Sequence, residues 1–102
     1  QWLAYAEEAD ILNVALFGFT AKAWREANPE LAKKNNVRDF ATINELTVLS
    51  NLESHNAQMI KEGKKKEERF KILQEIAEYQ LNVLNTAEKI KMLEDENQLV
   101  EI

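Results

Sequence analysis

Few residues in this 102-residue chain have the types and spacing that catalysis or metal binding requires. His55 is the single histidine. A metal site on a helix would need a second histidine or a carboxylate three or four residues away. Those positions hold other residue types: Asn51, Leu52, Gln58 and Met59. The chain has no cysteine, which excludes disulfides, thiolate metal sites and cysteine nucleophiles. We therefore expect His55 to be a structural or surface residue.

The acidic residues do not form a pattern typical of acid–base catalysis. They occur as neighbours at Glu7–Glu8, Glu67–Glu68 and Glu94–Glu96. Adjacent side chains on a helix point in different directions, whereas catalysis needs two carboxyls that face one cleft. Gly18 and Gly63 lie too far apart to build a phosphate-binding loop. These features predict a non-catalytic protein with no cofactor, no metal and no small-molecule substrate.

One segment is basic within an otherwise acidic chain. The net charge is −5 and the pI about 4.9, whereas residues 61–71 carry six positive and three negative side chains. This segment could contact the phosphates of a nucleic acid through Lys61, Lys64, Lys65, Lys66 and Arg69. The interleaved glutamates and the shortage of aromatic residues favour a solvated turn instead.

These residues must be positioned by helices. Two glycines and one proline are too few for a chain of tight β-turns. Residues 2–17 have a helical pattern that ends at Gly18, a usual helix-stopping residue. Thr20 can cap a short helix over residues 21–28, and Pro29 can open a further short turn over residues 29–35.

Two long helices complete the prediction. Thr42 and Glu45 have the spacing of a capping box that starts a helix running to Gly63. The apolar stripe of this helix is Ile43, Leu46, Leu49, Leu52, Met59 and Ile60, and Asn56 interrupts it. The last helix is expected from about residue 65 into the low nineties. A short glycine-containing turn makes the two helices antiparallel neighbours. The fold class is therefore all-α: a small helical bundle of two long antiparallel helices, an N-terminal helix and short helices.

The domain organisation follows from the same patterns. Residues 1–93 are predicted to form one helical domain, and the acidic tail 94–102 is expected to fray. Because an apolar helical pattern begins at the first residues, we expect a further part of the protein upstream. There is no signal peptide and no long apolar run, so a cytoplasmic location without membrane contact is expected.

The last helix carries more apolar surface than one neighbouring helix can cover. Its heptad-like residues Ile72, Ile76, Tyr79 and Val83 are candidates for an interface with a second copy or another protein. Trp24 and Arg25 in the short helix are the residue types of interface anchors, and they equally suit the edge of a core. Residues 20–39 could alternatively form a helix-turn-helix, although the proline and the acidic context count against it.

Several strings of the sequence are characteristic of a family. They are YAEEADILNVALFG, TAKAWREANP, NNVRDFATINELTVLSNLESHNAQMI and ERFKILQEIA. Together they span roughly residues 4–84 and resemble the C-terminal helical region of KilA-N proteins, DNA-binding proteins associated with bacterial phages and prophages. The resemblance implies that the whole protein binds DNA through an upstream domain, none of whose DNA-binding residues has a counterpart in this sequence. The turn after Gly63 is richer in lysine here than in the family pattern.

Two functions from different classes remain open at this point. The chain is predicted to be an accessory module of a KilA-N-like protein, which acts by self-association or by recruiting a protein partner. The alternative is direct nucleic-acid contact through residues 61–71. A homo-oligomer or a protein partner is expected in the first case, and binding that weakens steeply with salt in the second.

Overall fold

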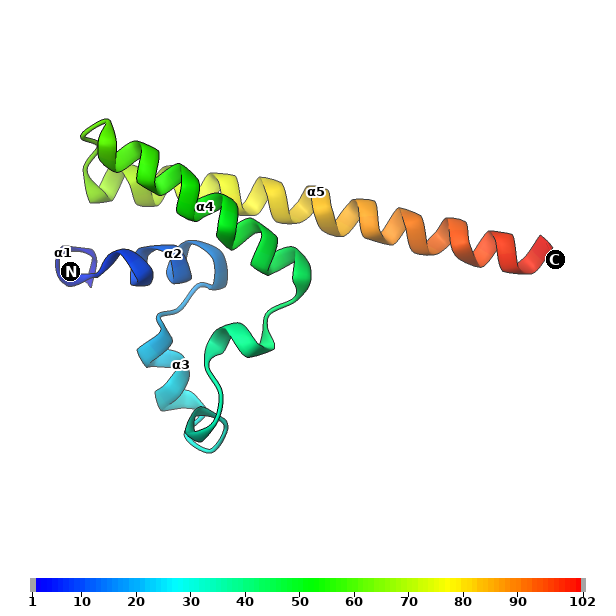
Figure 1. The fold of residues 1–102 in the computed structure, drawn as a ribbon, viewed down its shortest axis with the longest axis horizontal. Helices are drawn as coiled ribbons and strands as arrows, with labels where there is room; N and C mark the ends of the chain where they lie inside the picture. Colours follow the sequence, from blue (N-terminus) through cyan, green and yellow to red (C-terminus); the bar gives the residue numbers. More distant parts are fainter. Residues whose placement is uncertain (1, 102) are drawn as a thin grey trace.

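The computed structural model describes residues 2–101, with the side chains of residues 2–96, and these residues form helices joined by short loops. The α-helices and two 3₁₀-helices follow in the order α1 Trp2–Tyr5, α2 Glu8–Phe17, α3 Ala21–Ala27, η1 Leu31–Lys33, η2 Val37–Phe40, α4 Ile43–Lys61 and α5 Lys66–Glu101. The prediction of a small all-α bundle built on two long helices is confirmed (Figure 1).

Helices α4 and α5 form an antiparallel hairpin whose ends are defined by local sequence. Thr42 Oγ1 accepts a hydrogen bond from the Glu45 N–H at 3.1 Å, and Glu45 Oε1 accepts one from the Thr42 N–H at 2.8 Å. This is the predicted capping box. At the other end Gly63 has φ +81°, and the Lys64 N–H donates to the Met59 carbonyl at 3.0 Å. A glycine in this conformation ends α4 and turns the chain back into α5.

The N-terminal segment is two helices rather than the predicted single one. The break falls at residues 6–7, where Asp10 Oδ2 accepts from the Glu7 N–H at 3.1 Å and so starts a new helix. The Ala6 carbonyl, freed at the break, accepts a hydrogen bond from Lys66 Nζ at 2.8 Å. The chain therefore bends where a side chain of α5 reaches it, which periodicity within residues 2–17 cannot show.

The core lies where α2 crosses the α4–α5 hairpin. Its buried members are Leu3, Ala6, Ile11, Leu12, Val48, Leu49, Leu52, Met59, Leu73 and Ala77. The predicted stripe of α4 is partly wrong, because Ile43, Leu46 and Ile60 are exposed while Val48 is fully buried. The face that α4 buries is thus rotated from the predicted one.

Helix α5 gives the molecule an extended shape. Its 36 residues correspond to about 54 Å, against about 28 Å for the 19 residues of α4. The radius of gyration is 16.9 Å, whereas a compact domain of this length has one of about 13 Å. The second half of α5 leaves the bundle and projects alone (Figure 1). It continues to Glu101 instead of ending in the low nineties.

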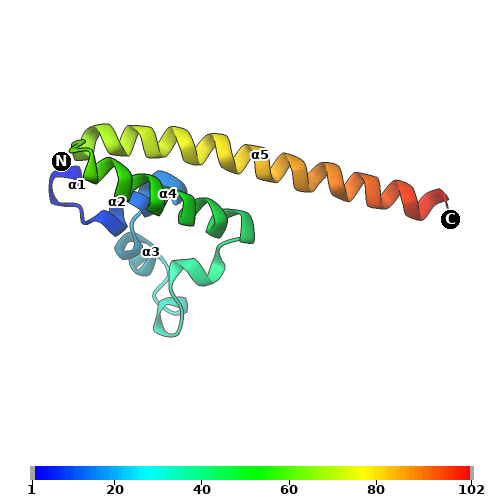
Figure 2. The same ribbon diagram turned by 45° about the horizontal axis from the view of Figure 1, so that its top comes forward.

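Helix α3 and the two 3₁₀-helices, residues 21–40, form a small lobe that lies below α2 and α4 in the views of Figures 1 and 2. Thr20 Oγ1 accepts from the Ala23 N–H at 3.0 Å, which is the predicted cap of α3. The second element of the suggested helix-turn-helix is the single 3₁₀ turn η1. A recognition helix is therefore not present in residues 20–39.

Candidate functional site

The exposed face of α5 gathers large apolar side chains that no other described helix covers. Tyr79 is 72% exposed, and Val83, Ile90 and Leu93 are each about half exposed. Monomeric proteins usually expose such residues singly rather than in a row. This row, defined as the α5 seam, is the candidate interaction site.

The four predicted interface residues of α5 divide into two pairs. Ile72 and Ile76 are partly buried and pack against the core, so they are largely used within the chain. Tyr79 and Val83 are exposed and remain available. The structure therefore places the available part of the predicted surface further along α5, toward its C-terminal end.

Polar contacts close the side of α5 that faces α4. Asn51 Nδ2 donates to Gln80 Oε1 at 3.0 Å. Asn44 Nδ2 lies 2.8 Å from both Asn85 Oδ1 and Glu88 Oε2. These bonds hold α4 along one flank of α5 as far as Glu88. A shallow groove remains between the helices, beside the side chains of Tyr79 and Val83.

Trp24 and Arg25 lie in the lobe, away from the α5 seam. Trp24 is half-buried, with its ring centroid 5.8 Å from that of Phe40. Arg25 is exposed. Trp24 thus contributes to the packing of the lobe, which agrees with the alternative that it is the edge of a small core. Among the described residues, no hydrogen bond, ion pair or ring contact joins Trp24 or Arg25 to the apolar row of α5.

The basic turn is not a uniform phosphate-binding surface, because Arg69 is buried. Only 5% of Arg69 is exposed, and its guanidinium lies inside the bundle. Nη1 donates to Glu8 Oε1 at 2.6 Å and to Asn56 Oδ1 at 2.7 Å, while Nε donates to the Lys64 carbonyl at 3.0 Å. Arg69 is therefore unavailable to a nucleic acid in this fold, contrary to its predicted place among the phosphate contacts.

The lysines of the turn are engaged to different degrees. Lys66 Nζ donates a hydrogen bond to the Ala6 carbonyl. Lys64 Nζ lies 3.7 Å from Glu68 Oε1 in an ion pair at the surface. Lys61 and Lys65 are exposed. Two freely exposed lysines among several glutamates make a weak electrostatic site for a phosphate backbone.

Glu8, Asn56 and Arg69 form a buried polar clamp that joins α2, α4 and α5. Asn56 Nδ2 donates to Glu8 Oε1 at 2.8 Å, and Arg69 Nη2 donates to Glu8 Oε2 at 3.2 Å, in addition to the two bonds from Arg69 Nη1. The hydrogen bond from Arg69 is the main cause that holds the pKa of Glu8 below its usual value, against the opposing effect of burial. Sequence reasoning missed this clamp. The only signal was Asn56, which interrupts the apolar stripe of α4.

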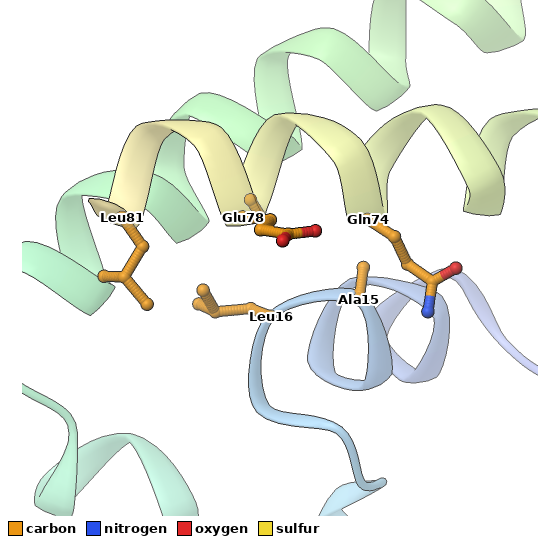
Figure 3. Close-up of a pocket in the computed structure, with 6 residues that line it drawn as sticks. Ala15, Leu16, Gln74, Glu78 and Leu81 are labelled. Carbon is orange, nitrogen blue, oxygen red and sulfur yellow. The ribbon is translucent and has the colours of Figure 1, made fainter. Parts of the chain in front are cut away.

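The cleft between α2 and α5 is lined by a single titratable side chain. It has a volume of about 220 Å³ and is lined by Ala15 and Leu16 of α2 and by Gln74, Ala77, Glu78 and Leu81 of α5. Figure 3 shows a single carboxylate, that of Glu78, among apolar and amide groups. Acid–base or nucleophilic catalysis requires a second group with a complementary role.

Comparisons with known proteins do not add a site. Comparisons with protein-family models, with curated proteins and with solved structures each give no match. Within residues 2–96 no three histidine or acidic side chains are grouped to hold a metal ion. No helix in the described part of the chain combines the length and apolar character needed to cross a bilayer.

Proposed function

We propose that this chain is a self-association module, and that it serves as an accessory part of a KilA-N-like DNA-binding protein. The observation that carries the proposal is the α5 seam: Tyr79, Val83, Ile90 and Leu93 form an exposed apolar row on a helix that continues beyond the Glu88 hydrogen bond to α4. Burying such side chains is the main favourable contribution to protein association.

The context within a DNA-binding protein rests on the resemblance of residues 4–84 to the C-terminal region of KilA-N proteins. Association through such a region would hold two DNA-binding domains together. It would thereby raise the effective concentration of the second domain once the first has bound. Direct DNA contact by residues 61–71 is the weaker candidate, because Arg69 is buried and Lys66 bonds to Ala6.

Sedimentation of the chain over a concentration series tests self-association. The mass is expected to rise from that of one chain to that of two. Tyr79→Glu should return the protein to the monomer, because it places charges inside the paired surface. Tyr79 is mostly exposed within one chain, so this change should leave the helical content unaltered.

Tyr5→Glu is the matched control for this experiment. Tyr5 is 89% exposed and lies on α1, away from the α5 seam, so the same substitution there should leave the dimer intact. A protein that stays monomeric at the highest soluble concentration would contradict the proposal. Equal effects of the two substitutions would contradict the placement of the interface.

A further inference from the structure

The α5 seam follows the repeat of a coiled coil. With Thr86 inside the row and the partly buried Ile76 at its bundle end, the residues alternate three- and four-residue steps: Ile76, Tyr79, Val83, Thr86, Ile90 and Leu93. In heptad notation Ile76, Val83 and Ile90 occupy position a, and the other three occupy position d. In parallel coiled coils, β-branched residues at a combined with Leu at d favour two strands; here all three a residues are β-branched, and Leu occupies d at Leu93.

From Tyr79 onward this repeat faces away from the bundle. At 3.6 residues per turn, Tyr79 lies about 160° around the helix from Ala77, which is buried against the core. A shallow groove follows the same outer face along Tyr79, Asn82, Val83, Thr86, Ala87 and Ile90. A surface this straight and narrow fits another helix. Because one apolar row with a heptad repeat is complementary to itself, a second copy of α5 is an occupant of the right shape.

Charge on either side of the α5 seam selects the direction of the second helix. Lys89 is at position g and Glu94 at position e of the following heptad. The residues three and four positions from Lys89 are Asn85, Thr86, Met92 and Leu93, so no acidic neighbour on its own helix can pair with it. The ion pairs among the described residues involve neither Lys89 nor Glu94.

In a parallel, in-register pair a g residue lies beside the e residue five positions further along the partner helix. Lys89 of each helix then lies beside Glu94 of the other, which gives two opposite-charge pairs in one dimer. In an antiparallel pair g residues face g residues. When the whole row from Ile76 to Leu93 is overlapped, Lys89 meets Asn82 of the other helix, and it reaches the g residue Glu96 only in a register that removes Ile76 and Tyr79 from the overlap. The parallel arrangement is therefore the one in which both charged groups find a partner while the whole row is paired.

We propose that residues 76–94 of α5 pair with those of a second copy as a parallel, in-register, two-stranded coiled coil, in which Lys89 of each helix faces Glu94 of the other. This proposal rests on the self-association proposed above. Helix α4 lies on one flank of α5, and a twofold axis along the coil places the second α4 on the opposite flank. Both bundles are then held at the same end of the coil.

Single cysteines test the direction directly, because the natural chain has none. Thr86→Cys and Leu93→Cys place a thiol at two successive d positions. In a parallel, in-register pair both variants should form a disulfide-linked dimer under mild oxidation, since each thiol lies opposite its own copy. In an antiparallel pair only a residue at the centre of the dimer meets its own copy. Two positions one heptad apart therefore cannot both crosslink.

Asp95→Cys is the control, because Asp95 lies at position f on the outside of the coil and should not crosslink. Charge reversal gives an independent readout. Lys89→Glu alone, or Glu94→Lys alone, should weaken the dimer by roughly fivefold to tenfold at low salt, and the double variant should restore it.

The outcomes separate the two proposals. A dimer by sedimentation in which at most one d-position variant crosslinks, with no restoration by the double charge variant, overturns the parallel arrangement and leaves self-association standing. A monomer at every concentration overturns both. Crosslinking at both d positions together with rescue by the double variant supports the parallel coil.

Discussion

Arg69 Nη1 lies 2.6 Å from Glu8 Oε1 and so joins the first turns of α5 and α2, which are 61 residues apart in the sequence. The Arg69 side chain is buried, while the Glu8 side chain is 44% exposed. The same nitrogen also reaches Asn56 of α4. One side chain therefore fixes the relative position of the three helices that form the core, while the adjacent turn is held through the Lys64 carbonyl.

Replacement of Arg69 should lower the free energy of unfolding mainly because it leaves the buried Asn56 side chain without a hydrogen-bond donor. Arg69→Met should lower the free energy of unfolding by about 2–3 kcal/mol, since Asn56 would lose a buried hydrogen-bond donor. In Arg69→Met with Asn56→Leu, no unpaired amide remains. The double variant should therefore lose less than the sum of the two single losses. Chemical denaturation of all four proteins measures this coupling, and strict additivity would contradict it.

The clamp should make stability depend on pH on the acid side. The pKa of Glu8 is lowered in the folded protein, chiefly by the hydrogen bond from Arg69. Its contribution is fully present above the ordinary value of 4.5 and is lost as pH falls through the lower folded-state pKa. Thermal midpoints of the natural chain and of Glu8→Gln should converge as pH falls below 4.5. A constant difference between them across that range would show that Glu8 acts without its charge.

Features specified by neighbouring residues were predictable from the sequence. The Thr42–Glu45 capping box and the turn at Gly63 depend on a few adjacent positions, and both are present as predicted. The exposure of Tyr79 and Val83 follows in part from their heptad-like spacing. These signals suffice to give the order of the helices and the hairpin of α4 and α5.

Features that depend on distant contacts were not predictable in the same way. Periodicity allows more than one apolar face on α4, and only its packing with α2 and α5 selects Val48 over Ile43. Arg69 resembled its lysine neighbours in sequence, and its burial depends on Glu8, 61 positions away. The interruption of the stripe at Asn56 marked a polar contact in the core, but it could not identify the partner.

The turn at Gly63 provides a test of backbone strain without crowding. Its φ is +81°, and a Cβ built there would meet no atom within 4 Å. Gly63→Ala should therefore lower the free energy of unfolding by about 1–2 kcal/mol from conformation alone. Gly63→Asn should lower it by less, since asparagine tolerates the left-handed region better. Denaturant titration measures both variants, and equal losses would indicate a cause other than the backbone conformation.

Helix α5 should have separable roles in folding and in association. The fully buried core residues of α5 lie at or before Ala77, and Glu88 makes the hydrogen bond to α4 that lies furthest along α5 among the described residues. A chain that ends after Glu88 should keep its helical bundle. At concentrations where the full chain is monomeric, the free energies of unfolding of the shortened and the full chain should differ by less than about 0.5 kcal/mol. Because Ile90 and Leu93 are then absent, the shortened chain should no longer dimerise in sedimentation. A shortened chain that unfolds would place part of the folding energy in the projecting helix, and one that still dimerises would place the interface on the bundle itself.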